Sequence, residues 1–215
     1  MKKILIVALM ASIALPSFAQ NEDGDKKGGF KKDRLFTGGS LTLSFSNNGS
    51  VLGAAPVFGY RITNWLDAGV VANFVYNSVR HVTYYNPATG QYFYSDDKLR
   101  QFTYGPGAFI RVYPINFLFA QAQVEHNFIS QKLIFDNGSP SERESTSATS
   151  ILVGAGYATG RQGSGDLFYY VSILFDVNKD PKSPYVEQTA SGSVNVLPII
   201  RAGLQVPLFQ GKKRN

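Results

Sequence analysis

Apolar and polar residues alternate with a period of two from Leu35 onward. In the first such segment, Leu41, Leu43 and Phe45 alternate with Ser and Thr residues. Successive side chains of a β-strand point to opposite faces, so the pattern predicts strands with one apolar and one polar face. Eight segments show it, each near the roughly 9–11 residues of a tilted transmembrane strand. They cover residues 40–46, 53–60, 67–77, 102–113, 118–127, 150–157, 169–178 and 195–208.

The connections between these segments alternate in length. The short ones lie at Ile62, Pro114 and Gly160, and the longer polar ones begin at Arg80, Asp136 and Asp180. A short turn at residues 47–50 is the exception among the long class. Short periplasmic turns and longer outer loops are typical of outer-membrane barrels. We therefore predict an all-β fold, an eight-stranded antiparallel up-and-down transmembrane barrel over residues 35–209.

The two faces of the predicted strands differ in composition. One face is nearly free of charge, with His126 as its main irregularity, whereas the other carries small, polar and charged residues. Alternation alone does not exclude a secreted lipocalin-like barrel, which is apolar inside. A charge-free face with aromatic residues near the strand ends favours the membrane barrel. The aromatic residues expected at the two membrane interfaces are Tyr60, Trp65, Tyr76, Tyr104, Tyr157 and Tyr169.

The first 19 residues have the pattern of a signal peptide. Lys2 and Lys3 precede an apolar run of about twelve residues, too short for a membrane-spanning helix, and Ser17 and Ala19 form a cleavage site. We expect an exported chain that begins at Gln20, with a flexible periplasmic segment over 20–34 and a basic periplasmic tail over 210–215. The expected location is the outer membrane of the cell.

The net charge of +6 lies entirely outside the predicted barrel. Basic residues exceed acidic ones in the signal peptide, in 20–34 and in the tail, whereas 35–209 is neutral. A neutral body has no global field to attract a polyanion, so nucleic acid is not an expected partner.

Catalytic chemistry has little support in the sequence. The chain has no cysteine and two histidines, His81 and His126, so we expect no metal site and no cofactor. Some eight-stranded barrels modify lipid A with a His and a Ser at the lipid-facing side. Here His126 and Ser130 share a face, but four residues of strand separate them by about 13 Å, too far for a nucleophile and its base. We therefore predict no catalytic residues.

Two groups of residues are candidate sites. Charged residues on the inner face should form a structural ion-pair network in the lumen, because buried charges need partners; a gated proton or ion path is the alternative. These residues are Arg61, Arg111, Glu125, Asp176 and Arg201. The segment 81–94 holds aromatic residues around Asn86–Gly90 and predicts a hairpin above the membrane. Its aromatic residues either pack on one another or bind a partner, and they are Tyr84, Tyr85, Tyr92, Phe93 and Tyr94.

Four stretches of the sequence carry a family resemblance. They are Gly105–Pro114, Leu118–Glu125, Gly38–Ser46 and Phe58–Trp65. They resemble the small outer-membrane β-barrel proteins common in Bacteroidota, which are related in fold to the outer-membrane protein A and X type. The resemblance covers about 35–209 and implies location and topology, since most members have no known activity.

We therefore expect a non-enzymatic integral barrel with a structural, adhesive or partner-binding role carried by its outer loops. A small transport or secretion-accessory barrel is the alternative, and a lipid A-modifying enzyme is less favoured. The expected partners are outer-membrane lipid and lipopolysaccharide, an unknown surface or periplasmic protein, and the barrel-assembly machinery during biogenesis. The last partner is expected because the final strand ends in Phe209, as such strands commonly do.

Overall fold

The computed structural model describes residues 30–46, 49–159, 167–188 and 194–209. The predicted signal peptide, most of the segment 20–34, the tail 210–215 and the Gly-rich turn at 160–166 lie outside the described residues. Within the described part, no helix is long and apolar enough to cross a membrane. A short 3₁₀ turn, η2 (Lys32–Arg34), leads into the first strand.

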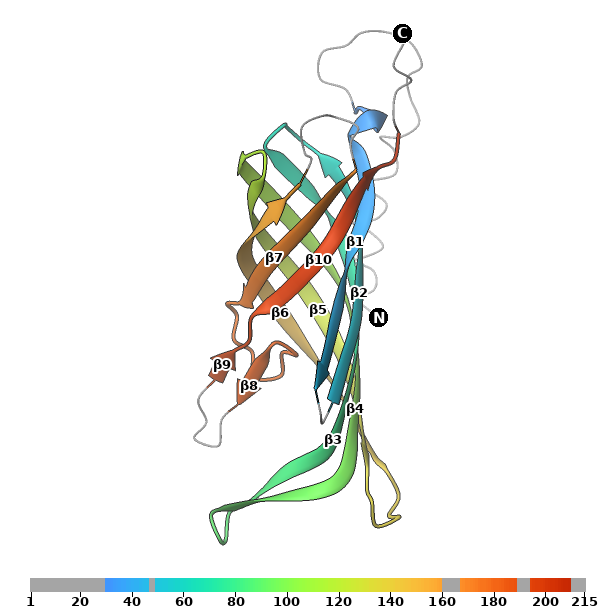
Figure 1. The fold of residues 1–215 in the computed structure, drawn as a ribbon, viewed down its shortest axis with the longest axis vertical. Helices are drawn as coiled ribbons and strands as arrows, with labels where there is room; N and C mark the ends of the chain where they lie inside the picture. Colours follow the sequence, from blue (N-terminus) through green and yellow to red (C-terminus); the bar gives the residue numbers. More distant parts are fainter. Residues whose placement is uncertain (1–29, 47–48, 160–166, 189–193, 210–215) are drawn as a thin grey trace, which may run out of the picture. The chain divides into compact units, whose positions relative to one another are not determined.

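Eight strands close into a barrel in which each strand is antiparallel to its neighbours (Figure 1). The order around the barrel is β1-β10-β7-β6-β5-β4-β3-β2, so sequential strands pair and the last strand closes on the first. The predicted up-and-down fold is confirmed. The strands are β1 (Leu35–Ser46), β2 (Gly49–Arg61), β3 (Leu66–Asn86), β4 (Gln91–Ile115), β5 (Leu118–Ile134), β6 (Glu142–Ala158), β7 (Phe168–Asp176) and β10 (Ile199–Pro207).

Six of these strands, β1 to β6, are longer than predicted, and the difference is largest for β3 to β6. β3 and β4 have 21 and 25 residues, and β5 and β6 have 17 each. Pairing of β3 with β2 ends at Val79, beyond which β3 and β4 continue as a two-stranded hairpin (Figure 1). The hairpin predicted around Asn86–Gly90 is confirmed, and Gly90 takes the positive φ of 66° that its turn requires. The loop predicted over 136–147 is shorter, because β6 begins at Glu142.

The connection between β7 and β10 contains a second, two-stranded sheet that the sequence did not predict. It pairs β8 (Val186–Gln188) with β9 (Val194–Val196). The prediction that Val196 belongs to the last barrel strand is wrong, because Val196 pairs with Val186. Pro198 has no N–H to donate, and β10 starts at the residue after it.

The two faces of the barrel have the predicted alternation. Outward-facing apolar side chains are exposed, with Val70 at 56% and Ile200 at 59%, whereas the inward-facing Glu125 and Asp67 are at 0%. The exposed apolar side chains form a belt around all the strands whose side chains are described. Its members include Leu52, Phe58, Val70, Phe74, Phe102, Tyr104, Ile110, Val124, Phe128, Val153, Val171, Ile173, Ile200 and Leu204.

Candidate functional site

A row of polar side chains on β5 runs along the inside of the barrel. Gln121, Gln123, Glu125 and Asn127 are two residues apart, so they all point into the lumen, and all four are buried. Gln121 donates from Nε2 to Gln123 Oε1 at 2.7 Å, and Gln123 Nε2 donates to Glu125 Oε1. Asn127 continues the row by donating to Ser150 Oγ at 3.2 Å. This β5 ladder connects the charged groups of the lumen.

An ion pair crosses the middle of the lumen. Arg201 Nη2 of β10 lies 2.9 Å from Glu125 Oε1 of β5, and the two side chains are 6% and 0% exposed. β7 and β6 separate β10 from β5 in the wall, so the pair bridges strands that are not neighbours. A buried pair of this kind offsets the desolvation of each charge only if the remaining polar atoms are also hydrogen-bonded.

The hydroxyl of Tyr185 completes this central group. Tyr185 belongs to the connection between β7 and β10, yet it is only 8% exposed. Its hydroxyl donates to Glu125 Oε2 at 2.7 Å and accepts hydrogen bonds from Asn73 Nδ2 at 2.7 Å and Arg201 Nη2 at 3.4 Å. The long connection therefore sends an aromatic side chain back into the lumen, where it binds residues of β3, β5 and β10.

Asp176 anchors the same connection where it leaves β7. Ser183 Oγ donates to Asp176 Oδ2 at 2.6 Å and also contacts Ser150 Oγ at 2.9 Å. Asp176 Oδ1 accepts from the backbone N–H groups of Ile151 and Asn178. Asp176 thus joins the β5 ladder through two serine hydroxyls, where the sequence had suggested an ion-pair role.

Arg111 lies nearer the end of the lumen where short turns follow β2 and β4. We call this the short-turn end and the opposite one the long-loop end. Arg111 donates from Nε to Gln121 Oε1 at 2.7 Å and from Nη1 to Gln205 Oε1 at 3.3 Å. Its guanidinium also lies within cation–π distance of three rings. The centroids are 4.4 Å away for Tyr170, 4.8 Å for Phe109 and 5.3 Å for Phe119. Phe119 packs over Gly156, where a Cβ atom would lie 2.3 Å from the ring.

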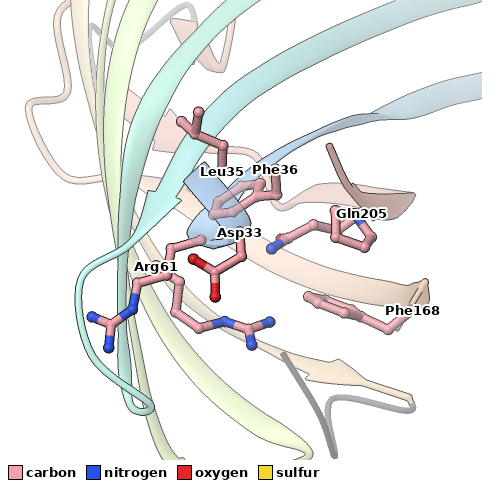
Figure 2. A pocket seen from close by; sticks show the side chains of 8 residues that line it. Asp33, Leu35, Phe36, Arg61, Phe168 and Gln205 are labelled. Atoms are coloured by element: carbon pink, nitrogen blue, oxygen red, sulfur yellow. The ribbon is translucent and has the colours of Figure 1, made fainter. Parts of the chain in front are cut away.

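A small pocket opens at the short-turn end, and Arg61 lines it. Asp33, Phe36, Phe168 and Gln205 converge on the same pocket (Figure 2). Arg61 is half-buried, and its register partner across β2 and β3 is Asp67, which in turn faces Arg111. The five predicted lumenal residues therefore lie at three levels. Arg61 and Arg111 are near the short turns, Glu125 and Arg201 are in the middle, and Asp176 is near the long loops.

The aromatic residues of the long β3–β4 hairpin pack against one another across the strands. Tyr84 stacks on Phe93 with centroids 5.5 Å apart, and Tyr85 contacts Tyr92 at 5.0 Å. Both pairs are direct register partners. Tyr85, Tyr92 and Phe93 remain about half exposed, and the side chain of Tyr94 lies outside the described residues.

Asp97 ties the hairpin to the start of the β5–β6 connection. It accepts a hydrogen bond from the backbone N–H of Asp136 at 2.8 Å and another from the Tyr84 hydroxyl at 2.9 Å. The Asp136 N–H above all holds the pKa of Asp97 below its usual value, because it stabilises the ionised carboxylate. Burial, together with the hydrogen bond to Asp97, raises the pKa of Tyr84.

The predicted interface aromatics lie on the outer face. Trp65, Tyr157 and Tyr169 belong to the short-turn end, and all three are more than half exposed. Tyr76 and Tyr104 lie toward the long-loop end, where Tyr104 stacks on Phe128 at 5.1 Å. Tyr60 is partly exposed on the same outer face.

The outward His126 contacts the hydroxyl of Thr149 at 3.0 Å. Among the described residues, no three His, Cys, Asp or Glu side chains are grouped closely enough to hold a metal ion.

Sequence reasoning did not find Asn73, Ser183, Tyr185 and Gln205 as members of the lumenal network. Asn73 and Gln205 have inward parity, which was a usable signal. Tyr185 and Ser183 lie in a connection without periodicity, so nothing in the local pattern indicated that they enter the barrel.

Comparisons with known proteins give a fold-level likeness. No protein-family model matches the chain, and no curated protein sequence matches it. Among solved structures, it is similar to Ail, the attachment invasion locus protein of Yersinia pestis, in a crystal structure with the heparin analogue sucrose octasulfate. The TM-score is 0.42 at 10% identity, and the match covers 80% of this chain and 93% of Ail.

Proposed function

We propose that the protein is a non-enzymatic integral barrel of the outer membrane. The observation that carries this proposal is the inverted distribution of polarity, with ionic groups buried in the lumen and an apolar belt exposed around the wall. Soluble monomers rarely expose a contiguous apolar patch above a few hundred Å². Contact with lipid acyl chains explains an apolar belt that follows every wall strand. The outward aromatic residues at both ends of the belt suit the two membrane–water interfaces.

The functional surface of this protein is the set of connections at the long-loop end. The β3–β4 hairpin extends well beyond the barrel and presents the half-exposed Tyr85, Tyr92 and Phe93. Exposed aromatic side chains on this hairpin suit contact with a surface, a partner protein or lipopolysaccharide. The barrel then serves as the anchor. The barrel-assembly machinery is its partner during insertion.

We favour this anchor over a small transport or secretion-accessory barrel because of what fills the lumen. Tyr185 and the Glu125–Arg201 pair occupy its middle, and the rings around Arg111 occupy the short-turn end. An eight-stranded barrel has an interior just wide enough for side chains. These groups leave little space for a solute path.

Membrane fractionation combined with heat-modifiability on a gel tests the proposal. We expect the protein in the outer-membrane fraction, with a band that shifts when the sample is boiled. We also expect no steady conductance from the purified barrel in a planar bilayer. A soluble periplasmic protein without a band shift would refute the membrane location, and a steady conductance would favour the transport reading.

A further inference from the structure

Five basic side chains gather on the outer wall just beyond the aromatic residues at the long-loop end. All have the outward parity of the apolar belt, and they lie on four adjacent strands, β3 to β6. We call them the basic cluster. Its members are Arg80, Lys98, Arg100, Lys132 and Arg143.

The strand register places like charges directly side by side. Arg100 is the partner of Lys132, and Lys132 is the partner of Arg143. In a second row, Arg80 is the partner of Lys98. Neighbouring strands are about 4.8 Å apart, and like charges directly opposite each other on a sheet are destabilising. Arranging five cations in this way has a cost in stability that the fold alone does not explain.

No carboxylate in the described residues relieves this repulsion. None of the five cations has an ion-pair or hydrogen-bond partner among the described residues. Asp96 is held by His81 at 2.7 Å. Glu142 and Glu144 alternate with Arg143 on β6, so they point to the opposite face of the sheet. The basic cluster is therefore open to an external anion.

The surroundings of the basic cluster indicate what kind of anion fits. Phe102 and Arg100 are two residues apart on the same face of β4, and Phe128 and Lys132 are four residues apart on the same face of β5. In each pair the aromatic residue is nearer the middle of the barrel, so the apolar belt ends where the cations begin. On β5 and β6 a pair of hydroxyls separates the belt from the cations: Ser130 is the register partner of Ser145, and its partner on β4 is Phe102. An apolar belt, then hydroxyls, then cations matches acyl chains, a sugar and a phosphate in that order.

We propose that the basic cluster binds the phosphate of a phosphorylated glycolipid in the outer leaflet. The acyl chains lie along the apolar belt, the sugar meets the serine hydroxyls, and the phosphate sits among Arg100, Lys132 and Arg143. Arg and Lys side chains form strong charge-assisted hydrogen bonds to phosphate oxygens. This inference rests on the proposed membrane location, and it names the site through which the barrel meets lipopolysaccharide.

The test is calorimetric titration of the full chain, folded in detergent micelles, with phosphorylated lipid A. The variant Arg100→Gln/Lys132→Gln removes two cations of the basic cluster, and Lys31→Gln/Lys32→Gln removes two exposed cations that precede β1 as the matched control. We expect the first variant to raise Kd at least about tenfold, since each charge-assisted contact accounts for about a factor of ten. The control should bind like the wild type.

Two further measurements keep the outcomes distinct. Without ligand, the Arg100→Gln/Lys132→Gln variant should be at least as heat-resistant as the wild type, because like charges have been removed; this also shows that it folds. Dephosphorylated lipid A should bind the wild type no better than it binds the variant.

Equal binding of phosphorylated lipid A by wild type and variant would overturn the site. Binding of inorganic phosphate or polyglutamate as tight as that of lipid A would overturn the glycolipid assignment. The micelle titration does not depend on fractionation, so failure of the site is separable from failure of the membrane location.

Discussion

At the scale of single residues, stability depends on how completely the buried polar atoms of the lumen are satisfied. Glu125 has the densest set of partners, since it pairs with Arg201 and accepts from Gln123 and Tyr185. Inward parity on a charge-bearing strand was enough to predict that Glu125 and Arg201 enter the lumen. Their pairing across the barrel depends on the register and diameter of the closed sheet, which no local pattern contains.

Replacing Glu125 by Ala should destabilise the folded barrel by about 3–5 kcal/mol, because Arg201 would keep a buried charge without its carboxylate. The temperature at which the folded band disappears on a gel measures this loss. A double variant, Glu125→Leu/Arg201→Met, should recover most of it, since neither charge remains. If Glu125→Ala melts like the wild type, the ion pair has no structural role.

Tyr185→Phe isolates the hydroxyl that three strands share. The ring stays in place, but Asn73, Glu125 and Arg201 each lose a hydrogen-bond partner, so we expect a loss of about 1–3 kcal/mol. Tyr185→Ala should in addition release the β7–β10 connection to limited proteolysis. Tyr92→Phe, in the exposed hairpin, is the matched control and should change neither property. A wild-type cleavage rate in Tyr185→Ala would mean that this residue does not hold the connection.

At the scale of elements, the long strands explain where sequence reasoning stopped short. Alternation of apolar and polar residues identified the part of each strand that faces the apolar belt. Beyond Tyr76 on β3 and before Phe102 on β4, the outward residues become basic or polar while backbone pairing continues. The pattern therefore predicted strands that ended too early, at Asn77 on β3 and at Phe102 on β4, although it did predict the hairpin at 81–94.

The base of this hairpin, where Asp97 lies, should loosen in acid. The folded-state pKa of Asp97 lies below the unfolded value of about 3.9, so the ionised carboxylate stabilises the fold above that value. This contribution is lost as the pH falls through the lower, folded-state pKa. The protection factor of the Asp136 amide, which compares its exchange rate with that of an unfolded peptide at the same pH, should therefore fall in strong acid. Asp97→Asn should lower this protection factor already at neutral pH and remove most of its pH dependence; an unchanged protection factor in that variant would contradict the assignment.

Replacing residues 82–95 by a short turn tests whether the hairpin is separable from the barrel. Pairing of β3 with β2 and of β4 with β5 ends at Val79 and Lys98, so the wall should stay closed. We expect the heat-dependent band shift to persist while surface binding is lost. Binding that survives the deletion would remove the hairpin aromatics from the proposed function.

At the scale of the whole molecule, the barrel combines a lipid-compatible exterior with an interior in which a polar network runs alongside buried apolar clusters. The β5 ladder joins Arg111 at one level to Glu125 at the next, and the two serines carry it on to Asp176. Composition and alternation predicted the two faces and the closure into eight strands. They did not predict that a connection would complete the interior, because Tyr185 reaches it only after the wall has formed.

The pairing of β1 with β10 has a consequence for the order of folding. Phe36 meets Pro207, so the ends of the barrel sequence must find each other before the wall is complete. Contacts between such distant residues are costly in chain entropy and form late. Arg201 belongs to that closing strand, so an intermediate that lacks β10 holds Glu125 without its counter-charge. Water must remain in such an intermediate to solvate the carboxylate, and the interior dries only when the last strand arrives.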